Sequence, residues 1–364
     1  MLGMDGKRYD HKERPELNNG YERHECTLSL VCTLDLTNEW MLSLSLSYSV
    51  MEFIAPQEYM VRPPQPPVYF FVIEVTYAAV ISGLLQATVN AIKRAMSSLN
   101  ADPRTQIGFL TFDHQLHFYN LKSSLSQPQM LVVPDVAAYT EGMFLPLPYD
   151  LLVNLRDSQH VVDALLDKLP AMFASTQHVD SALGPALKAA SGVVVRGTKS
   201  SQSISLSLSL SLSLSLILSF IVLRCAQRAV GGKVIVLASS LPTVGVGKLR
   251  NRQAECNAEN ESKMLAVADQ WYQRYALEAS RVQISVDLFM YTAKHADVAT
   301  LGVLSRFTGG ELFYYNLSGK DQLQGGKRLE EDLVTDLTRQ TGFEAVLRVR
   351  CSKGTVARVC VLCG

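Results

Sequence analysis

Residues 62–77 read RPPQPPVYFFVIEVTY and contain the segment that decides the fold. Seven of the eight residues from Val68 to Val75 are apolar, and Glu74 is the exception. A run this continuous predicts a strand buried on both faces, as in a parallel sheet, because a half-solvated strand would alternate. The prolines just before it cannot donate to a sheet, so they lead the chain stiffly into this first strand.

The rest of the body alternates strand and helix patterns, which is typical of a mostly parallel sheet with helices on both faces. Further strands are expected at 106–112, 117–121, 233–238, 283–291 and, at an edge, 311–315. Helices are expected at 84–99, 160–173, 179–190, 262–280, 298–307 and 328–340. This order suits a von Willebrand A-type, Rossmann-like α/β fold, and a strand that starts at 344 leads elsewhere.

Composition narrows the function classes. Lys plus Arg and Asp plus Glu both number 34, so the net charge is +0, which argues against a strongly basic nucleic-acid binder. The N-terminus is polar and shows no apolar signal segment, so a cytosolic protein is expected. The cysteines number seven, and the pair Cys360 and Cys363 has no second pair to complete a zinc site.

A metal-binding A-type domain needs oxygen ligands on three loops at the carboxyl ends of its strands. The first loop carries Glu74-Val-Thr-Tyr-Ala78 where Asp-x-Ser-x-Ser would stand. The middle loop offers Asp180 or Ser181, and the third has Ser239 followed by serine and leucine where an aspartate would be expected. With a carboxylate and a hydroxyl missing, no functional metal site is expected.

Other candidate chemistry is weak. The glycines before Lys233 precede a strand, whereas those of a phosphate-binding loop follow one. The segment from Asp113 to His117 offers two imidazoles, but a solvated turn is the more ordinary interpretation. No serine or cysteine nucleophile stands in an elbow or beside a recognisable base, so the chain is predicted not to be an enzyme.

Seven stretches in order carry a family resemblance. They are EFIAPQEYMVRPPQPP at 52–67, DPRTQIGF at 102–109, FLPLP at 144–148, ALGPALK at 182–188, GGKVI at 231–235, LPTVGVGKL at 241–249 and LSRFTGG at 304–310. Together they closely resemble the trunk domain of the cargo-adaptor subunit of the COPII vesicle coat, the Sec twenty-four family. The zinc-ribbon module that precedes the trunk in this family is not seen, so no cofactor is expected.

The resemblance implies a non-enzymatic coat component that is cytosolic and is recruited to the endoplasmic reticulum surface. It would pair with the GTPase-activating inner-coat subunit and gather membrane cargo through short cytoplasmic sorting signals. Arginines of the family at the positions of Arg62, Arg348 and Arg350 line cargo sites. Arg348 and Arg350 lie two apart on an expected strand and so share one face, where they could clamp carboxylates. Ordinary solvated charge is the alternative for all three.

Two segments do not resemble the family. Residues 205–216 are six consecutive Ser-Leu pairs, and a shorter echo occurs at 42–47. We interpret residues 20–50 and 191–229 as intron-like insertions and expect disorder there. The uncharged run 204–223 is also long enough to span a bilayer, and its alternation would also suit an exposed strand.

The expected organisation is a remnant that follows the zinc ribbon at 1–19, the insertion at 20–50, and a trunk domain at 51–346 interrupted at 191–229. Residues 347–364 would begin a β-sandwich and end in an aberrant tail. Two other functions stay open at this point. One is a metal-dependent von Willebrand A-type interaction module, and the other is a non-functional fragment of a mis-spliced transcript.

Overall fold

The computed structural model describes residues 23–29, 47–53, 66–99, 102–136, 145–147, 150–197, 231–253, 264–317 and 322–339. The chain divides into two compact units, Met1–Pro64 and Gln65–Gly364. In the first unit, β1 (Arg23–Ser29) pairs antiparallel with β2 (Ser47–Phe53), and Cys26 lies opposite Val50. Part of the segment expected to be disordered therefore forms paired strands, while its origin as an insertion stays a prediction.

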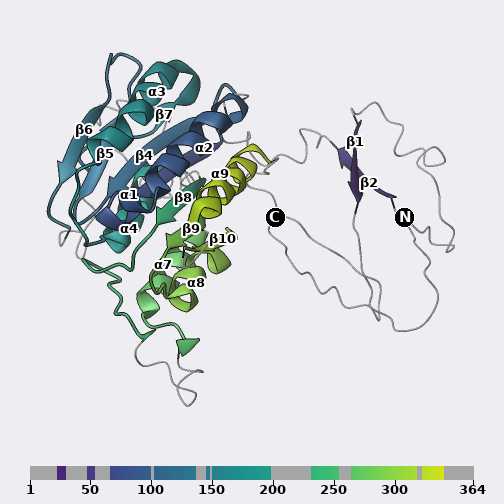
Figure 1. Ribbon diagram of the computed structural model, residues 1–364. Coiled ribbons are helices and arrows are strands. Elements are labelled where there is room, and N and C mark those ends of the chain that lie inside the picture. The colour runs from purple at the N-terminus through teal and green to yellow at the C-terminus, as the bar shows by residue number, and fades with distance from the viewer. Residues whose placement is uncertain are drawn as a thin grey trace, which may run out of the picture. The chain divides into compact units, whose positions relative to one another are not determined.

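The second unit is built on one sheet with the strand order β10-β9-β8-β3-β4-β5-β6, and β7 pairs with β4 (Figure 1). Its strands are β3 (Val68–Glu74), β4 (Gln106–Phe112), β5 (Leu116–Asn120), β6 (Gln129–Val133), β7 (Val153–Asn154), β8 (Gly232–Ala238), β9 (Ile284–Thr292) and β10 (Leu312–Asn316). Strands β4, β3, β8, β9 and β10 run parallel, whereas β5, β6 and β7 join by antiparallel pairing. Counted from β3 and without β6 and β7, this is the doubly wound order 3-2-1-4-5-6 with an antiparallel third strand, so the predicted α/β fold is confirmed.

Strand β3 is central, as its apolar run predicts, and every residue in it is buried. Its side chains alternate between two separate cores. Phe70 and Val72 join the core on one face, whereas Phe71 and Ile73 join the core on the other. The continuous apolar run is therefore the requirement of a strand that has helices above and below it.

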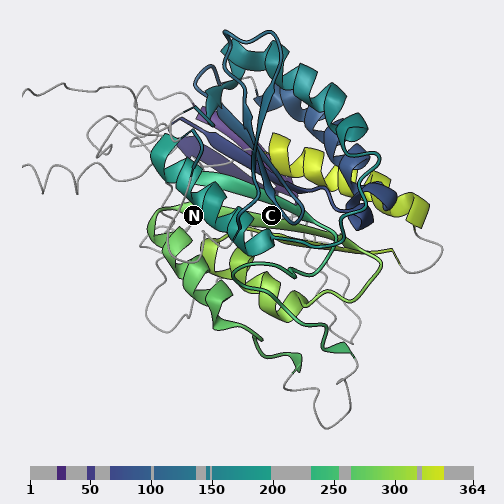
Figure 2. The same ribbon diagram turned by 90° about the vertical axis from the view of Figure 1, so that its left-hand side faces the viewer.

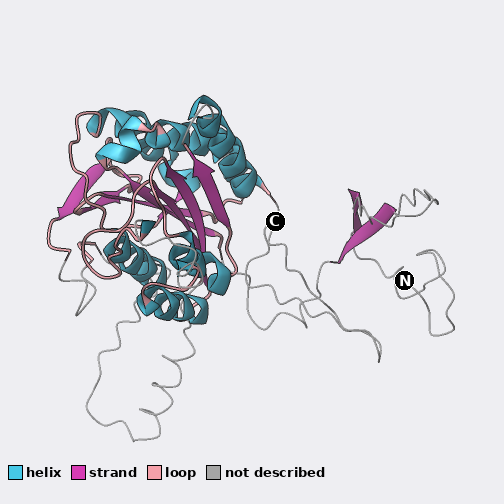
Figure 3. Ribbon diagram, turned by 60° about the horizontal axis from the view of Figure 1, so that its bottom comes forward, coloured by secondary structure: helices cyan, strands magenta, loops and turns pink. Residues whose placement is uncertain are grey.

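Helices cover both faces of the sheet (Figures 2 and 3). One face packs against α1 (Tyr77–Ile81), α2 (Leu84–Leu99), α3 (Leu155–Met172) and α9 (Gln322–Thr338). The other packs against α4 (Leu183–Gly197), α7 (Gln270–Arg281) and α8 (Val298–Thr308). Helices α2 and α9 are far apart in sequence but lie side by side (Figure 2).

Several helix boundaries differ from the sequence expectation. Helix α3 begins at Leu155 rather than 160, because the Asn154 side chain caps it by accepting from the amides of Arg156 and Asp157. Helix α7 begins at Gln270 rather than 262, and Asp269 caps it. Helix α4 begins four residues later than expected, and α9 begins six residues earlier.

The correction at α7 has a clear cause. Leu265 falls within the expected helix 262–280, where its spacing from Trp271, Tyr272 and Tyr275 would place it on an apolar side, but it lies before the helix and is 74% exposed. Tyr272 and Tyr275 are buried, as expected from the same pattern. A cap therefore decided the start of the helix, and the apolar spacing before it was accidental.

The loop after β8 closes against α7. Gly247 has a positive φ of 70°, and a Cβ atom there would lie 2.7 Å from the indole ring of Trp271. The hydroxyl of Tyr272 donates to the Gly247 carbonyl at 2.6 Å. Trp271 also stacks on Tyr275, with ring centroids 5.4 Å apart. A side chain at position 247 would both strain the backbone and push the loop away from α7.

The Ser-Leu run lies outside the described residues. Residues 191–197, which the sequence analysis assigned to the insertion, complete α4, and Val193 and Val194 are buried in the core. Across the part of the chain that the structure describes, no helix combines the length and the apolar character that a membrane span requires.

Candidate functional site

The carboxyl end of β3 carries a fully buried carboxylate. Glu74 has no exposed surface, and its Oε1 atom accepts a hydrogen bond of 2.7 Å from the hydroxyl of Thr76. Thr76 in turn caps α1 by accepting from the Ala79 amide at 3.5 Å. Both side chains therefore belong to the turn that joins β3 to its helix, where ligands bind in doubly wound sheets.

The loop after β8 supplies the remaining partners of Glu74. The amides of Ser239 and Ser240 donate to Oε2 at 2.6 and 3.2 Å, and the Ser240 hydroxyl donates to Oε1. Each carboxylate oxygen thus accepts two hydrogen bonds from the protein. Burial raises the pKa of Glu74, and the bonds from Ser240, Ser239 and Thr76 oppose that rise.

The middle loop of the predicted metal motif is tied to the same region. The hydroxyl of Thr243 donates to Asp180 Oδ1 at 2.9 Å and accepts from the Ser181 amide at 3.0 Å. Asp180 is exposed, so the structure pairs it with the β8 loop at the surface. The three loops do converge as the sequence predicts. The buried carboxylate at these loops is that of Glu74, however, and both of its oxygens already accept hydrogen bonds from the protein. A cation that bound there would have to displace these donors.

The other sequence candidates are placed only in part. Arg62, Arg348 and Arg350 lie outside the described residues, and so does the cysteine pair at 360–363. His117 was expected in a solvated turn, but it is only 6% exposed and its Nδ1 atom lies 3.2 Å from the Thr111 hydroxyl. It is buried because β5 returns antiparallel beside β4 and carries His117 into the sheet.

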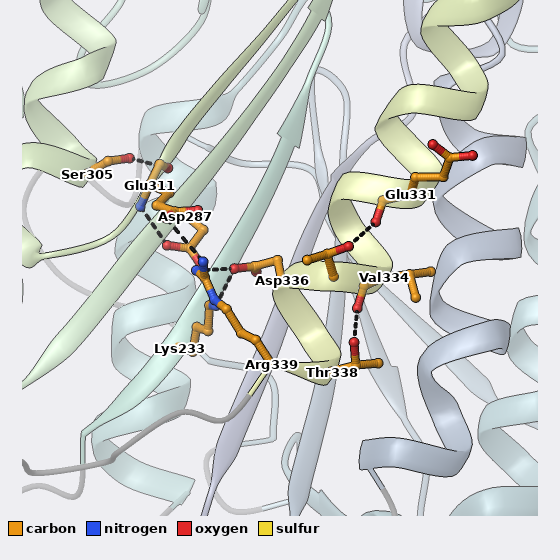
Figure 4. A network of polar contacts seen from close by, with 10 residues as sticks. Lys233, Asp287, Ser305, Glu311, Glu331, Val334, Asp336, Thr338 and Arg339 are labelled. Atoms are coloured by element: carbon orange, nitrogen blue, oxygen red, sulfur yellow. Dashed lines mark hydrogen bonds and ion pairs between the residues drawn. The ribbon is translucent and has the colours of Figure 1, made fainter. Parts of the chain in front are cut away.

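A buried ionic network is the feature that sequence reasoning missed (Figure 4). Lys233 on β8 lies 2.6 Å from Asp287 on β9 and 2.8 Å from Asp336 on α9. Arg339 pairs with Asp336 at 2.5 Å and with Glu311 at 3.1 Å. The network holds the last turn of α9 against the sheet, just before the chain continues toward residues 344–350.

Electrostatics in this network balance burial against charge. Burial, followed by the charge of Asp287, raises the pKa of Asp336 to about 6. Burial alone would lower the pKa of Lys233, but the two carboxylates outweigh it and raise that pKa. A lysine and an aspartate inside apolar strands were the available signal, because buried charges need partners. The helix residue that completes the trio lies 103 positions away.

The sequence comparison decides the family. The profile described as the Sec23/Sec24 trunk domain matches residues 64–211 and 201–337. The chain belongs to the Sec24 family. Among Sec24 relatives, the protein transport protein SEC24 A of Arabidopsis thaliana is 38% identical over 356 residues, covering 97% of this chain and 28% of that protein. Human protein transport protein Sec24A is 39% identical over 312 residues, covering 84% of this chain and 25% of that protein.

A solved Sec24 structure agrees with the fold. The crystal structure of the human COPII-coat protein Sec24c matches with a TM-score of 0.59 and 28% identity, over 80% of this chain and 39% of that chain. This chain spans about a quarter of the length of the curated Sec24 relatives that it matches. The resemblance found in the sequence is thereby confirmed for the trunk domain.

Proposed function

We propose that the chain is a COPII coat component that acts by binding rather than by catalysis. The observation that carries the proposal is the match of the Sec23/Sec24 trunk profile across residues 64–337, on a sheet whose fold is intact around the interruption. Relatives named as protein transport proteins, and a structure named as a COPII-coat protein, support the same role. In this role the chain associates peripherally with the endoplasmic reticulum from the cytoplasmic side.

The partner proposed is the GTPase-activating inner-coat subunit. The test is a pull-down with the full chain as bait, followed by measurement of the dissociation constant. A matched control is Val72→Asp, because Val72 is fully buried in β3 and a charge there should unfold the domain. We expect the wild-type chain to bind and the control to lose binding. Failure of the folded wild-type chain to retain the partner would overturn the proposal.

Cargo recognition is proposed for the arginines. Arg348 and Arg350 follow α9, whose end is fixed by the Arg339 pairs with Asp336 and Glu311. Charge-assisted bidentate bonds to a carboxylate are strong. The double variant Arg348→Ala with Arg350→Ala should therefore lower the affinity for an acidic sorting peptide by roughly tenfold. Arg62→Ala tests separately the other cargo site that the resemblance implies, the one at Arg62. Fluorescence anisotropy measures the peptide affinity, and an unchanged value would remove these arginines from the site.

The metal-dependent alternative has less support. Both oxygens of Glu74 are bonded to Thr76 and to the β8 loop, and no aspartate follows β8. No specific observation favours that function, and the transcript alternative concerns segments 20–50 and 191–229, which the structure describes only in part.

A further inference from the structure

A second group of potential ligands lies near the same edge of the sheet, but it shares no residue with the Glu74 network. Asp113 and His114 form the turn between β4 and β5, and His178 lies in the connection between α3 and α4. Each offers one ligand atom, and these atoms lie within 4.8 Å of one another. The two imidazole rings are in contact, with centroids 4.1 Å apart and their planes tilted by 42°. We call these three residues the histidine–aspartate cluster.

Backbone hydrogen bonds hold both segments of the cluster. The Asp113 carbonyl accepts from the Ala182 amide at 2.7 Å, and the His178 carbonyl accepts from the Tyr77 amide at 2.8 Å. The Asp113 carboxylate accepts from the Gln115 amide at 2.8 Å, which fixes the turn. The three side chains are therefore brought together by the folded framework, and a ligand that joins them would find them partly preorganised.

The charge of the cluster is incompletely compensated. Asp113 is buried, and its ion-pair partners among the described residues are histidines, His114 at 3.2 Å and His117 at 4.0 Å. The Nδ1 atom of His114 is shielded from solvent and makes no hydrogen bond of proper geometry. The Asp113 carboxylate therefore has no lysine or arginine partner within the described residues, and a buried carboxylate calls for a partner.

We propose that the histidine–aspartate cluster binds a divalent transition-metal ion of the zinc class. Two imidazoles and one carboxylate suit zinc, copper or nickel, whereas magnesium and calcium prefer oxygen ligands alone. Three protein ligands leave a fourth position for water, and tetrahedral zinc needs ligand atoms about 3.3 Å apart, which small side-chain rotations would provide. His178 is exposed and His114 is 33% exposed, so the ion can enter from solvent.

Bound metal would join two segments that are otherwise linked through the backbone. It would bridge the β4–β5 turn to the connection that leads into α4, and so would stabilise the folded state in proportion to its affinity. This role goes beyond coat assembly, because it needs neither cargo nor coat partner. It also differs from the Glu74 position, where the ligands are oxygens already bonded to the protein.

The test is zinc binding by the full chain, measured by competition with a chromophoric chelator. The cysteines are alkylated first, so that thiolates such as those at 360–363 cannot contribute. His178→Gln should lower the affinity for zinc by at least tenfold, since one of three ligands is lost. The matched control is His160→Gln, an exposed histidine on α3 outside the cluster, which should leave the affinity unchanged.

A second variant and a second metal guard against trivial results. Asp113→Asn keeps the acceptor for the Gln115 amide and should also lower the affinity for zinc. Circular dichroism checks that each variant folds. Cobalt bound to the alkylated chain should show a tetrahedral visible spectrum that His178→Gln removes. The proposal is overturned if alkylated wild-type chain binds neither metal, or if His160→Gln loses as much affinity as His178→Gln.

Discussion

The two faces of the sheet bury carboxylates in different ways. Among the residues that the structure describes, no cation pairs with Glu74, which accepts hydrogen bonds from hydroxyl and amide donors of two loops. On the opposite face, Asp287 and Asp336 are held by Lys233, with Arg339 at the margin. Several neutral donors stabilise the single charge of Glu74, whereas in the ionic network one lysine, Lys233, pairs with two buried carboxylates. The second arrangement should therefore be the more fragile of the two.

The largest effect is expected when that lysine is removed. Lys233→Met leaves Asp287 and Asp336 buried together without their common cation, which should lower the free energy of unfolding by about 3–5 kcal/mol. Urea denaturation at neutral pH measures the loss. The control is Lys93→Met, which breaks an exposed pair with Asp167 and should change stability by less than about 1 kcal/mol. If Lys93→Met lost as much free energy of unfolding as Lys233→Met, the buried network would not be the more fragile arrangement.

A smaller effect is expected at Glu74. In Glu74→Gln the shape is kept, but an amide NH₂ replaces one oxygen and faces donors that then lack an acceptor. The free energy of unfolding should fall by about 1–3 kcal/mol, because the unsatisfied groups stay buried. Asp180→Asn on the neighbouring surface is the control, with a change below about 0.5 kcal/mol. If Glu74→Gln destabilised more than Lys233→Met, the order of fragility would be reversed.

The pH dependence distinguishes the ionic network further. Asp336 has a folded-state pKa raised to about 6, above its ordinary value, so the folded chain takes up this proton before the unfolded chain does. This group therefore makes the free energy of unfolding rise as pH falls from about 6 toward 4. Asp336→Asn removes that contribution. Urea titrations should show that, as pH falls from 7 to 5, the free energy of unfolding of the wild type rises relative to that of the variant. If the free energies of both proteins changed with pH in parallel, the assignment to Asp336 would be wrong.

The smallest effect is expected from hard cations at Glu74. Millimolar Mg²⁺ or Ca²⁺ should leave the melting temperature unchanged, because both oxygens of Glu74 already accept two hydrogen bonds. A bound cation would raise it by mass action on the folded state. Thermal unfolding with and without the ions measures this. A rise that Glu74→Ala abolishes would show that the cation displaces the serine donors.

Local pattern was sufficient for the sheet but not for its side-chain partners. The apolar run at Val68 and the strand at 106–112 were predicted because burial on two faces leaves a continuous apolar signal. The convergence of the loops at Glu74 and Ser239 also followed, since parallel strands end at a common edge. The start of α7 did not follow, because one capping carboxylate at Asp269 outweighed an extended apolar spacing.

Contacts between distant segments were beyond the reach of pattern. Nothing near Lys233 indicates that Asp336 will face it, because that depends on how α9 is rotated against the sheet. His178 likewise has no sequence link to His114, and only the course of the α3–α4 connection brings the rings together. The arginine candidates lie outside the described residues and stay predictions.

The packing of Trp271 over Gly247 makes the β8 loop optically visible. The chain has 2 tryptophans, Trp40 and Trp271, and only Trp271 lies among the described residues of the second unit. Its indole rests on the same loop whose serines hold Glu74, and it stacks on Tyr275. Opening of that loop exposes the ring to water and shifts its emission to the red. With Trp40 replaced by phenylalanine, the fluorescence spectrum becomes a native reporter of the carboxyl edge of the sheet.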